Sequence, residues 1–506
     1  MWLGHIVQRG LERRPDALAL RDADRDVTWR QLHAEVHALA AHLADRIGPG
    51  GRLAVVSGNR AEVLEAYLAC AVARVVAVPV NPALTGREIA DILDAVEPAL
   101  LLAEPAHADR LREHHPGLPL LDITALGDLP AGGAPPTAGG LTDPVAILHT
   151  SATTGRAKGV VVDQRSLKLN ALSWLGEVAP QPGTVFLNAG PLFHGSMVIA
   201  LDYLAAGGTV CVLDRFTPQG CLAALERWRV EHAFLVPSMV RLLLGARALA
   251  GTDLSRFRLL LHGAAPMPAE LAEEAASRLD LALQAVFGIT EGGGPVLSLG
   301  PDTRVGEPRV PGAVCVGLPM LGTAARVVDE QGDLVPVGTV GELELRGDGL
   351  MQGYWKNPEA TAEALRHGWL RTRDLGYTDP EGRIWIVDRR NDLVLRGGQN
   401  VYPAEIEHVL RQSPRVADVV VVPAPDPVWG QTPVAFVQPV TPEAFDQGEL
   451  LDLCVAGLAG YKRPSRFLPI DQVPRSPAGK VLRARLRALA AGSPGTQPNG
   501  EVEPAR

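Results

Sequence analysis

The chain has 506 residues, 46% hydrophobic and 21% charged, which predicts a globular protein with two or more packed domains. A formal net charge of −9 leaves no basic surface for general nucleic-acid binding. The most apolar long stretch, residues 63–80, is interrupted by Glu65 and Arg74, which argues against a membrane span. Five cysteines without a C-x-x-C pair argue against a zinc site and, with no signal-peptide pattern, predict a cytoplasmic protein.

The first 110 residues alternate helical and strand patterns. Thr28 with Gln31 and Thr85 with Glu88 form capping-box pairs, which predict two helix starts. Buried strands are expected at residues 53–56, 75–80 and 100–103, and a further helix at residues 61–73. This alternation predicts an α/β domain with a largely parallel sheet.

A Gly/Pro-rich connector over residues 127–144 separates this region from the next α/β segment. That segment resumes with predicted strands at residues 145–148 and 258–261. Short strands and turns are expected over residues 312–345, as in a smaller β-rich subdomain. An α+β segment follows Asp392, with strands at Val394 and residues 419–422, a helix at residues 404–410 and a polar tail at the end.

Lysine is rare in this chain. Only five of its 48 basic residues are lysine, at positions 158, 168, 356, 462 and 480. A lysine that survives in such a background marks a place where a compact ammonium on a flexible stem is wanted, unless it survives by chance on the surface.

The sharpest motif is HTSATTGRAKGVVV, in which Thr150 to Lys158 follow the strand at residues 145–148. Small hydroxyl residues and glycines on a turn allow the backbone to wrap around phosphate oxygens, and Lys158 supplies a mobile cation. The loop lacks the Gly-Lys-Ser/Thr of a P-loop NTPase. The alternative is a flexible loop with a solvated lysine.

A second motif, AVFGITEGGG, places Thr290 and Glu291 after a strand and a glycine turn. The hydroxyl suits a phosphate oxygen, and the carboxylate suits Mg²⁺, which prefers oxygen ligands. The alternative is an ordinary helix cap.

Two further segments stand closer to the C-terminus. Asp374 is placed to accept ribose hydroxyls and Arg389 to meet ribose or phosphate, although the two residues could simply form an ion pair. In SPAGKVLR, Lys480 follows a glycine turn, where a lone lysine is often only solvated.

In this order and spacing, the four segments resemble the adenylate-forming superfamily of acyl- and aryl-CoA synthetases, luciferases and nonribosomal adenylation domains. The resemblance runs from Thr28 to about Arg485. It implies an α/β fold: a large N-terminal domain of layered α/β sheets plus a β-rich subdomain, followed by a small mobile α+β C-terminal domain. The implied boundaries are residues 1–391 for the AMP-binding domain, 392–488 for the C-terminal lid and 489–506 for a disordered tail.

The resemblance also implies roles for individual residues, with Lys480, Thr290 and Lys158 as the catalytic ones. ATP would be bound by Thr150, Ser151, Thr153, Thr154, Gly155, Lys158, Gly263, Ala264, Ala265, Phe287, Gly288, Thr290, Asp374, Arg389 and Lys480. Glu291 would bind Mg²⁺, and His194, Ser238 and Gly292 would line the acid pocket, although a satisfied buried histidine is the alternative for His194. Gly398 would face the CoA thiol, and Asn391 would be the hinge.

The implied activity is an ATP-dependent acid–CoA ligase. A carboxylate attacks the α-phosphate of ATP, pyrophosphate leaves, and the CoA thiol then attacks the acyl-adenylate after the C-terminal domain has rotated. ATP, Mg²⁺ and CoA are the expected cofactors or co-substrates, and an aryl or medium-chain acid is the expected substrate. Three alternatives stay open: loading of a carrier protein, activation of nitrite for diazotisation of an aryl amine, and a nucleotide-binding regulator without turnover.

Several positions depart from the pattern of the superfamily. Ala152 and Arg373 replace glycines, Ala157 replaces a frequent proline, and Asn391 replaces a common Asp or Lys. Phe287 replaces a common tyrosine, which keeps stacking on adenine and loses a hydroxyl contact. None of these changes removes a charged catalytic group.

Overall fold

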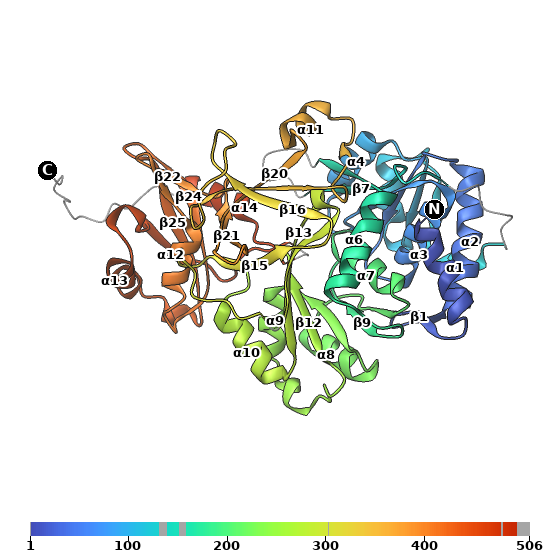
Figure 1. Ribbon diagram of the computed structural model, residues 1–506, viewed down its shortest axis with the longest axis horizontal. Helices are drawn as coiled ribbons and strands as arrows, with labels where there is room; N and C mark the ends of the chain where they lie inside the picture. The colour runs from blue at the N-terminus through green and yellow to red at the C-terminus, as the bar shows by residue number, and fades with distance from the viewer. Residues whose placement is uncertain (1, 131–138, 151–157, 302, 477–478, 493–506) are drawn as a thin grey trace. The chain divides into compact units, whose positions relative to one another are not determined.

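The computed structural model describes residues 2–130, 139–150, 158–301, 303–476 and 479–492 (Figure 1). The chain divides into two compact units. Unit 1 comprises residues 1–304, 316–325 and 344–372, and unit 2 comprises residues 305–315, 326–343 and 373–506. The β-rich segments predicted within residues 312–345 are therefore shared between the units, and the boundary at Asn391 stays a prediction.

Unit 1 contains two mainly parallel arrays of strands. One sheet has the order β18 (Gly353–Tyr354), β8 (Gly159–Asp163), β7 (Pro144–His149), β4 (Val76–Val80), β3 (Arg52–Val56), β5 (Leu100–Ala103) and β6 (Leu120–Asp122). The other runs through β14 (Gly294–Leu299), β13 (Ala282–Ile289), β12 (Leu259–Gly263), β11 (His232–Leu235), β9 (Val185–Asn188), β10 (Thr209–Val212), β1 (Leu18–Arg21) and β2 (Asp26–Thr28). From β13 to β1 all neighbours are parallel.

The helices of unit 1 are connected to these strands as the sequence predicts for an α/β domain. They are α1 (Trp2–Arg13), α2 (Trp29–Arg46), α3 (Ala61–Ala73), α4 (Gly86–Val96), α5 (Pro105–His114), α6 (Gln164–Glu177), α7 (Ser196–Ala205), α8 (Pro218–Arg227), α9 (Pro237–Leu244), α10 (Ala269–Leu279) and α11 (Pro358–Ala364). Both predicted capping boxes are confirmed: Thr28 caps α2 with Gln31, and Thr85 caps α4 with Glu88. Figure 1 shows α8, α9 and α10 beside β12.

Unit 2 has its own sheet and two hydrophobic clusters. The sheet has the order β23 (Gln399–Val401), β22 (Val394–Arg396), β25 (Gly430–Pro439) and β24 (Val416–Asp426), and β26 (Arg466–Pro469) pairs with β25. The helices α12 (Pro403–Leu410) and α13 (Gln447–Gly457) supply one cluster, and α14 (Arg483–Gly492) supplies the other. Alternating valines of β24 point into the two clusters, so this strand is buried on both faces.

The remaining strands of the β-rich region link the units along the chain. They are β15 (Val314–Pro319), β16 (Thr323–Val328), β17 (Gly341–Gly347), β19 (Leu365–Arg366), β20 (Trp369–Thr378) and β21 (Ile384–Arg389). Within unit 2, β20 and β21 are antiparallel from Asp374 to Thr378.

Two further features of the structure concern the length and hydropathy of its helices and the state of its cysteines. No helix among the described residues is long and apolar enough to cross a membrane. All five cysteines lie in the described part of the chain, where each is buried and outside any disulfide. Burial raises the pKa of the Cys211 and Cys221 thiols to about 12.

The fold places functional segments by a simple rule. In a parallel sheet, the loops that follow the carboxyl ends of neighbouring strands meet at one edge, and ligands bind there. In unit 1 the loops after β9, β11, β12 and β13 meet in this way. The segments that follow these strands contain all three residues predicted to line the acid pocket and three of those predicted to bind ATP, namely Ala264, Ala265 and Thr290.

Candidate active site

The two ends of the predicted phosphate loop are joined. Thr150 follows β7, Lys158 precedes β8, and the Thr150 amide donates to the Lys158 carbonyl at 3.1 Å. The hairpin therefore delivers the loop from adjacent antiparallel strands. The loop residues between them lie outside the described residues, including the predicted Ser151, Thr153, Thr154 and Gly155 and the departures Ala152 and Ala157.

Lys158 and the predicted magnesium ligand Glu291 meet at one aromatic side chain. The Lys158 ammonium lies 5.0 Å from the ring centroid of Tyr354, a distance at which a cation is attracted to the ring face. The Tyr354 hydroxyl donates to Glu291 Oε1 at 2.8 Å. The structure therefore brings the predicted phosphate cation and the predicted metal ligand together, although they are far apart in the sequence.

Tyr354 is held firmly in this position. It lies on β18, which pairs with β8 directly after Lys158, and its amide donates to Thr361 Oγ1 at 2.9 Å. The Met351 amide donates to the Glu291 carbonyl at 2.9 Å, which ties the same segment to Glu291. Tyr354 was not among the residues predicted from the sequence. The signal that could have found it is its place in the string GYWKNP near the rare Lys356.

The residues predicted to hold adenine lie at the ends of two neighbouring strands. Gly263 ends β12 and is paired with Val286 of β13, one residue before Phe287. A Cβ on Gly263 would clash with the Val286 carbonyl, so only glycine fits there. Ala264 follows in a left-handed backbone conformation with φ 64°, which turns the chain sharply at the sheet edge.

Thr290 directly continues β13. It begins a short 3₁₀ turn that also contains Glu291 and Gly292, so the hydroxyl and the carboxylate leave the sheet at the same edge. This turn carries the second predicted motif out of the strand at the place that the sequence pattern predicts.

The three residues predicted to line the acid pocket come from three elements. His194 lies in the irregular segment between β9 and α7, Ser238 lies in the first turn of α9 after β11, and Gly292 follows β13. All three elements leave the same edge of the parallel sheet. The three residues therefore follow the same edge of the sheet although they are far apart in the sequence. Their contacts with an acid stay a prediction.

In unit 2, Asp374 and Arg389 form an ion pair. They face each other across β20 and β21, and Arg389 Nε donates to Asp374 Oδ1 at 3.0 Å. Asp374 is buried, whereas the Arg389 side chain is half exposed. The ion pair that the sequence allowed as an alternative is thus present, and it leaves guanidinium surface accessible to a ligand.

Arg373, one of the departures from the superfamily pattern, has a left-handed backbone conformation. Its backbone has φ 63°, in the left-handed region where glycine carries no steric cost. Arg373 therefore keeps the conformation expected for the glycine it replaces. Its carbonyl accepts a bond from the Arg390 amide at 2.8 Å, which helps to hold this conformation.

The predicted hinge is held by the last helix of the chain. Arg487 of α14 donates to the Asn391 carbonyl at 3.3 Å and to Asp392 Oδ1 at 2.7 Å. Arg483 of the same helix pairs with Asp392 at 3.6 Å. Both arginines follow Lys480 closely in sequence, so the segment carrying Lys480 and the predicted hinge belong to one ion-pair network.

Gly397 and Gly398 form the tight turn between β22 and β23. Their φ values are 56° and 82°, as a two-residue turn of this kind requires. A Cβ on Gly397 would lie 2.8 Å from the Trp429 indole, and the Gly397 amide donates to the Trp429 carbonyl at 2.9 Å. Trp429 is half exposed, with the Arg396 guanidinium 5.9 Å from its ring centroid. This aromatic surface beside Gly398 was also missed from the sequence.

Lys480 lies on a small hairpin. The Ser476 amide donates to the Lys480 carbonyl at 2.7 Å, and the Lys480 amide donates to Ser476 Oγ at 3.2 Å. Arg475 anchors the hairpin by donating to Asp418 at 2.6 Å and to the Gly479 carbonyl at 3.0 Å. The hairpin thus presents Lys480 on a defined backbone.

The whole chain is similar to known adenylate-forming proteins. It matches the family described as AMP-binding enzyme over residues 7–355 and the AMP-binding enzyme C-terminal domain over residues 405–480. It is 35% identical to a feruloyl-CoA synthase from an Amycolatopsis species, covering 96% of this chain and 98% of that protein. It is also 35% identical to the fatty acid–[acyl-carrier-protein] ligase ScoC of Streptomyces coeruleorubidus, covering 94% and 93%. The ATP-bound structure of MatB from Rhodopseudomonas palustris superimposes with a TM-score of 0.89 at 29% identity, covering 96% and 98%.

Proposed function

Because this chain belongs to the AMP-binding enzymes of the adenylate-forming superfamily, we propose that it is an AMP-forming acid–CoA ligase. It couples ATP cleavage to formation of a carbon–sulfur bond, in the reaction class of the CoA ligases that it resembles along nearly its whole length. The observation in the structure that supports this most directly is the convergence of Lys158 and Glu291 on Tyr354.

The first step makes an unreactive carboxylate reactive. The acid attacks the α-phosphate of ATP, the bond from that phosphorus to the bridging oxygen breaks, and pyrophosphate leaves with the electron pair. The protein must align two anions and offset their repulsion, rather than form covalent bonds itself. In our proposal Lys158 and Lys480 supply positive charge and Thr290 orients the α-phosphate.

The residues around Glu291 suit a magnesium ion. The Glu291 side chain is half-buried and is oriented by the Tyr354 hydroxyl, and Thr290 precedes it in the same 3₁₀ turn. Oxygen donors of this kind are the ligands that Mg²⁺ prefers, usually together with substrate phosphates. When bound, the ion would neutralise phosphate charge. The task of Glu291 is to hold that position, and the task of Tyr354 is to orient Glu291.

The second step transfers the acyl group to a thiol. The CoA sulfur attacks the carbonyl carbon of the acyl-adenylate, and AMP leaves as the thioester forms. We assign the acceptor side to the turn at Gly398 and to the half-exposed Trp429, because an exposed indole suits stacking on the adenine of CoA. Lys480 serves the first step and Gly398 the second, and rotation at Asn391 exchanges them.

A carrier protein is the second candidate for the acceptor. It is favoured by one observation: ScoC, named as a fatty acid–[acyl-carrier-protein] ligase, is as similar in sequence as the feruloyl-CoA synthase. Both acceptors present a phosphopantetheine thiol, so the first step is the same for each. The proposed acid remains an aryl or medium-chain carboxylate.

The proposal is tested by following pyrophosphate with a panel of aromatic, short-chain and long-chain acids. We expect release that depends on one class of acid and on Mg²⁺, followed by thioester formation with CoA. Release of ADP and phosphate would contradict the proposal. Thioester on a carrier protein but not on CoA would assign the second acceptor, and product only from nitrite with an aryl amine would assign the diazotisation reaction.

A further inference from the structure

The segment that carries His194 is held by both backbone and side-chain hydrogen bonds, among them one from the His194 amide to the Pro191 carbonyl at 3.1 Å. It links β9 to α7 without regular secondary structure. The Gly190 carbonyl accepts a bond from Asn188 Nδ2 at 2.8 Å, and the Pro191 carbonyl accepts one from Ser196 Oγ at 2.6 Å. These two bonds come from residues close in sequence. They therefore define the local shape of the segment but not its position relative to the other sheet.

That position is set by Asn59, from the other sheet. Asn59 Nδ2 donates to the Gly190 carbonyl at 2.9 Å and to the Leu213 carbonyl at 3.1 Å, and Asn59 Oδ1 accepts from the Leu192 amide at 2.9 Å. Both amide hydrogens and the amide oxygen are therefore used. Asn59 follows β3, whereas Gly190 and Leu213 follow β9 and β10. A single side chain thus fastens the carboxyl edge of one sheet to that of the other.

A second contact from the same side comes from α3, which starts two residues after Asn59. The Tyr67 hydroxyl donates to the Leu192 carbonyl at 3.1 Å, and Tyr67 is fully buried. Leu192 therefore has its amide bonded to Asn59 and its carbonyl bonded to Tyr67. Because the residue is bonded on both sides, it cannot shift without breaking a buried hydrogen bond.

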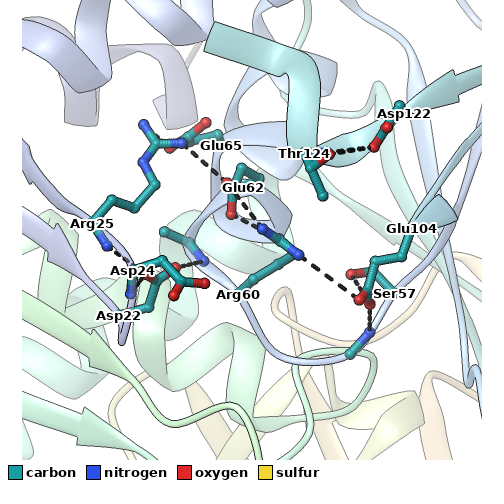
Figure 2. A network of polar contacts seen from close by, with 12 residues as sticks. Asp22, Asp24, Arg25, Ser57, Arg60, Glu62, Glu65, Glu104, Asp122 and Thr124 are labelled. Atoms are coloured by element: carbon teal, nitrogen blue, oxygen red, sulfur yellow. Dashed lines mark hydrogen bonds and ion pairs between the residues drawn. The ribbon is translucent and has the colours of Figure 1, made fainter. Parts of the chain in front are cut away.

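Asn59 lies between two anchored residues, Ser57 and Arg60, whose contacts Figure 2 shows. The Gly58 amide and the Ser57 hydroxyl donate to Glu104 Oε1 at 2.7 and 2.9 Å. On the other side, Arg60 pairs with Glu62 at 3.0 Å and with Glu104 at 3.8 Å. Both neighbours of Asn59 are thus tied to charged groups, so its amide is presented in one orientation.

The same network extends deeper into the unit. Arg25 pairs with Glu35 at 2.6 Å, with Glu62 at 3.2 Å and with the buried Glu65 at 3.4 Å. Glu62 is therefore shared by Arg25 and Arg60, which connects the segment around Asn59 to the core of the unit. Shared partners of this kind rigidify a site more than separate pairs do.

We propose that Asn59 is a positioning residue that sets acid selectivity by fixing the segment from Gly190 to Gly195. This inference rests on the proposed function, because His194 in that segment is assigned to the acid pocket. Asn59 would touch neither the acid nor ATP. It would act through the main chain of Leu192, two residues from His194.

A fixed wall matters for selectivity because small displacements change which acid fits. One methylene group in an apolar pocket separates substrates by about 10–200-fold, and a displacement of about 1 Å far from the reacting atoms is enough to lower activity by about 100-fold. Without Asn59 the segment loses two hydrogen bonds, and the bond from Asn59 to the Leu213 carbonyl after β10 is lost with them. We therefore expect the wall to shift and the discrimination between similar acids to weaken.

The test compares Asn59→Ala and Asn59→Asp with the unchanged protein on acids that differ by one methylene group or one ring hydroxyl. Asn59→Asp keeps the shape but replaces both donors with an oxygen that faces two carbonyls, so we expect it to be at least as damaging as alanine. For the preferred acid, kcat/KM should fall about tenfold or more through a higher KM. The KM values for ATP and CoA should stay within about twofold, and the preference between acids should shrink.

Two further variants separate positioning from general loss of stability. Tyr67→Phe removes only the bond to the Leu192 carbonyl and should shift the same acid preference by a smaller factor. Thr209→Val removes the bond from Thr209 Oγ1 to the Leu18 carbonyl, at 2.8 Å in the same unit and unrelated to the segment. It should lower the melting temperature and leave the acid preference unchanged.

The inference is overturned if the Asn59 variants lower only the melting temperature, or if they change the KM for ATP as much as that for the acid. If the Asn59 variants do not fold, Tyr67→Phe decides the question, because an unchanged acid preference in that variant also overturns the inference. Failure of the proposed function is distinct: the unchanged protein would then release no pyrophosphate with any acid.

Discussion

The predicted site residues are arranged differently in the two units. In unit 1, Lys158 and Glu291 both contact Tyr354, so groups meant for phosphate and metal form one cluster. In unit 2, Gly398 lies in the turn between β22 and β23, whereas the Lys480 backbone is hydrogen-bonded to that of Ser476. The predicted residues Lys158 and Glu291 of unit 1 thus share one contact, whereas Gly398 and Lys480 of unit 2 lie on separate segments.

In the proposed function, this difference would allow one site to serve two reactions. A cluster held by mutual contacts suits tasks common to both steps, such as binding the adenylate. Separate hairpins suit tasks that belong to one step each, because a movement can bring one forward and withdraw the other. Variants of the unit 1 cluster should therefore impair binding common to both steps, and variants at Lys480 or beside Gly398 in unit 2 should impair one step alone.

The largest expected effect separates the two steps. Lys480→Ala should lower adenylate formation by about 100–1,000-fold, since it removes a charge that stabilises the transition state. Pyrophosphate release measures that loss. The same variant should transfer the acyl group from supplied acyl-adenylate to CoA at nearly the normal rate. Lys356→Ala is the matched control, because Lys356 is half exposed and pairs with Glu97 at 2.9 Å. If Lys480→Ala kept full activity from ATP and acid, the assignment of Lys480 to adenylate formation would be wrong.

Tyr354→Phe should have the next largest effect. It keeps the ring near Lys158 and removes the hydroxyl that orients Glu291, so the Mg²⁺ concentration for half-maximal adenylation should rise about tenfold, as loss of a hydrogen bond to a charged group predicts. Equilibrium binding of Mn²⁺ in the presence of a non-hydrolysable ATP analogue gives a readout independent of turnover. Tyr377→Phe, which loses a bond from the Arg309 amide in unit 2, is the control. Unchanged Mn²⁺ binding would show that the hydroxyl has no such role.

A smaller effect is expected at the acceptor face of unit 2. Trp429→Ala should raise the KM for CoA about 5–10-fold, as loss of an aromatic stacking partner predicts, and should leave ATP–pyrophosphate exchange unchanged. The neighbouring Val428→Ala controls for a change at an exposed position. If Trp429→Ala slows the exchange and not thioester formation, the assignment of this face to the second step is wrong.

The smallest effect on activity is expected for a substitution of Glu65, in the ion-pair network around Arg25. Glu65 is 1% exposed, and burial, together with the nearby Glu35 and Glu62, holds the pKa of its carboxyl well above the usual range. The folded protein therefore keeps the proton on this carboxyl. Above the unfolded pKa of about 4.3, the unfolded chain has lost that proton, so the free energy of unfolding falls as the pH rises towards the folded pKa.

Glu65→Gln removes that loss of stability. It should raise the melting temperature at pH values well above the unfolded pKa of about 4.3, and the gain should vanish as the pH falls towards that value. Thermal unfolding over this pH range measures it, and acid activation should not change. A lower melting temperature at pH 8 would mean instead that Glu65 is charged and stabilised by Arg25.

Sequence patterns predicted what depends on neighbours in the chain. The capping boxes at Thr28 and Thr85 and the strand that delivers Thr150 were predicted because helix starts and buried strands follow local periodicity. The family resemblance supplied the predicted site residues, whose roles stay predictions. It could not show which of them meet, because contact between Lys158 and Tyr354 depends on the pairing of β8 with β18.

The residues that were missed share one property. Tyr354, Trp429 and Asn59 all contact segments distant in sequence, and none of them belongs to a residue type or spacing that signals chemistry by itself. Arg373 shows the converse case. Its departure from glycine was visible in the sequence, but that the position still takes a left-handed backbone is known only from the structure.

The burial of all five cysteine thiols has a practical consequence for assays. Every cysteine is buried, and the pKa values of Cys211 and Cys221 near 12 keep them protonated at neutral pH, so the folded protein has little nucleophilic sulfur for a disulfide-exchange dye. Consumption of CoA can therefore be followed by adding such a dye to samples withdrawn from the reaction, because the dye reacts with the free CoA thiol, and colour from the protein alone would report unfolding.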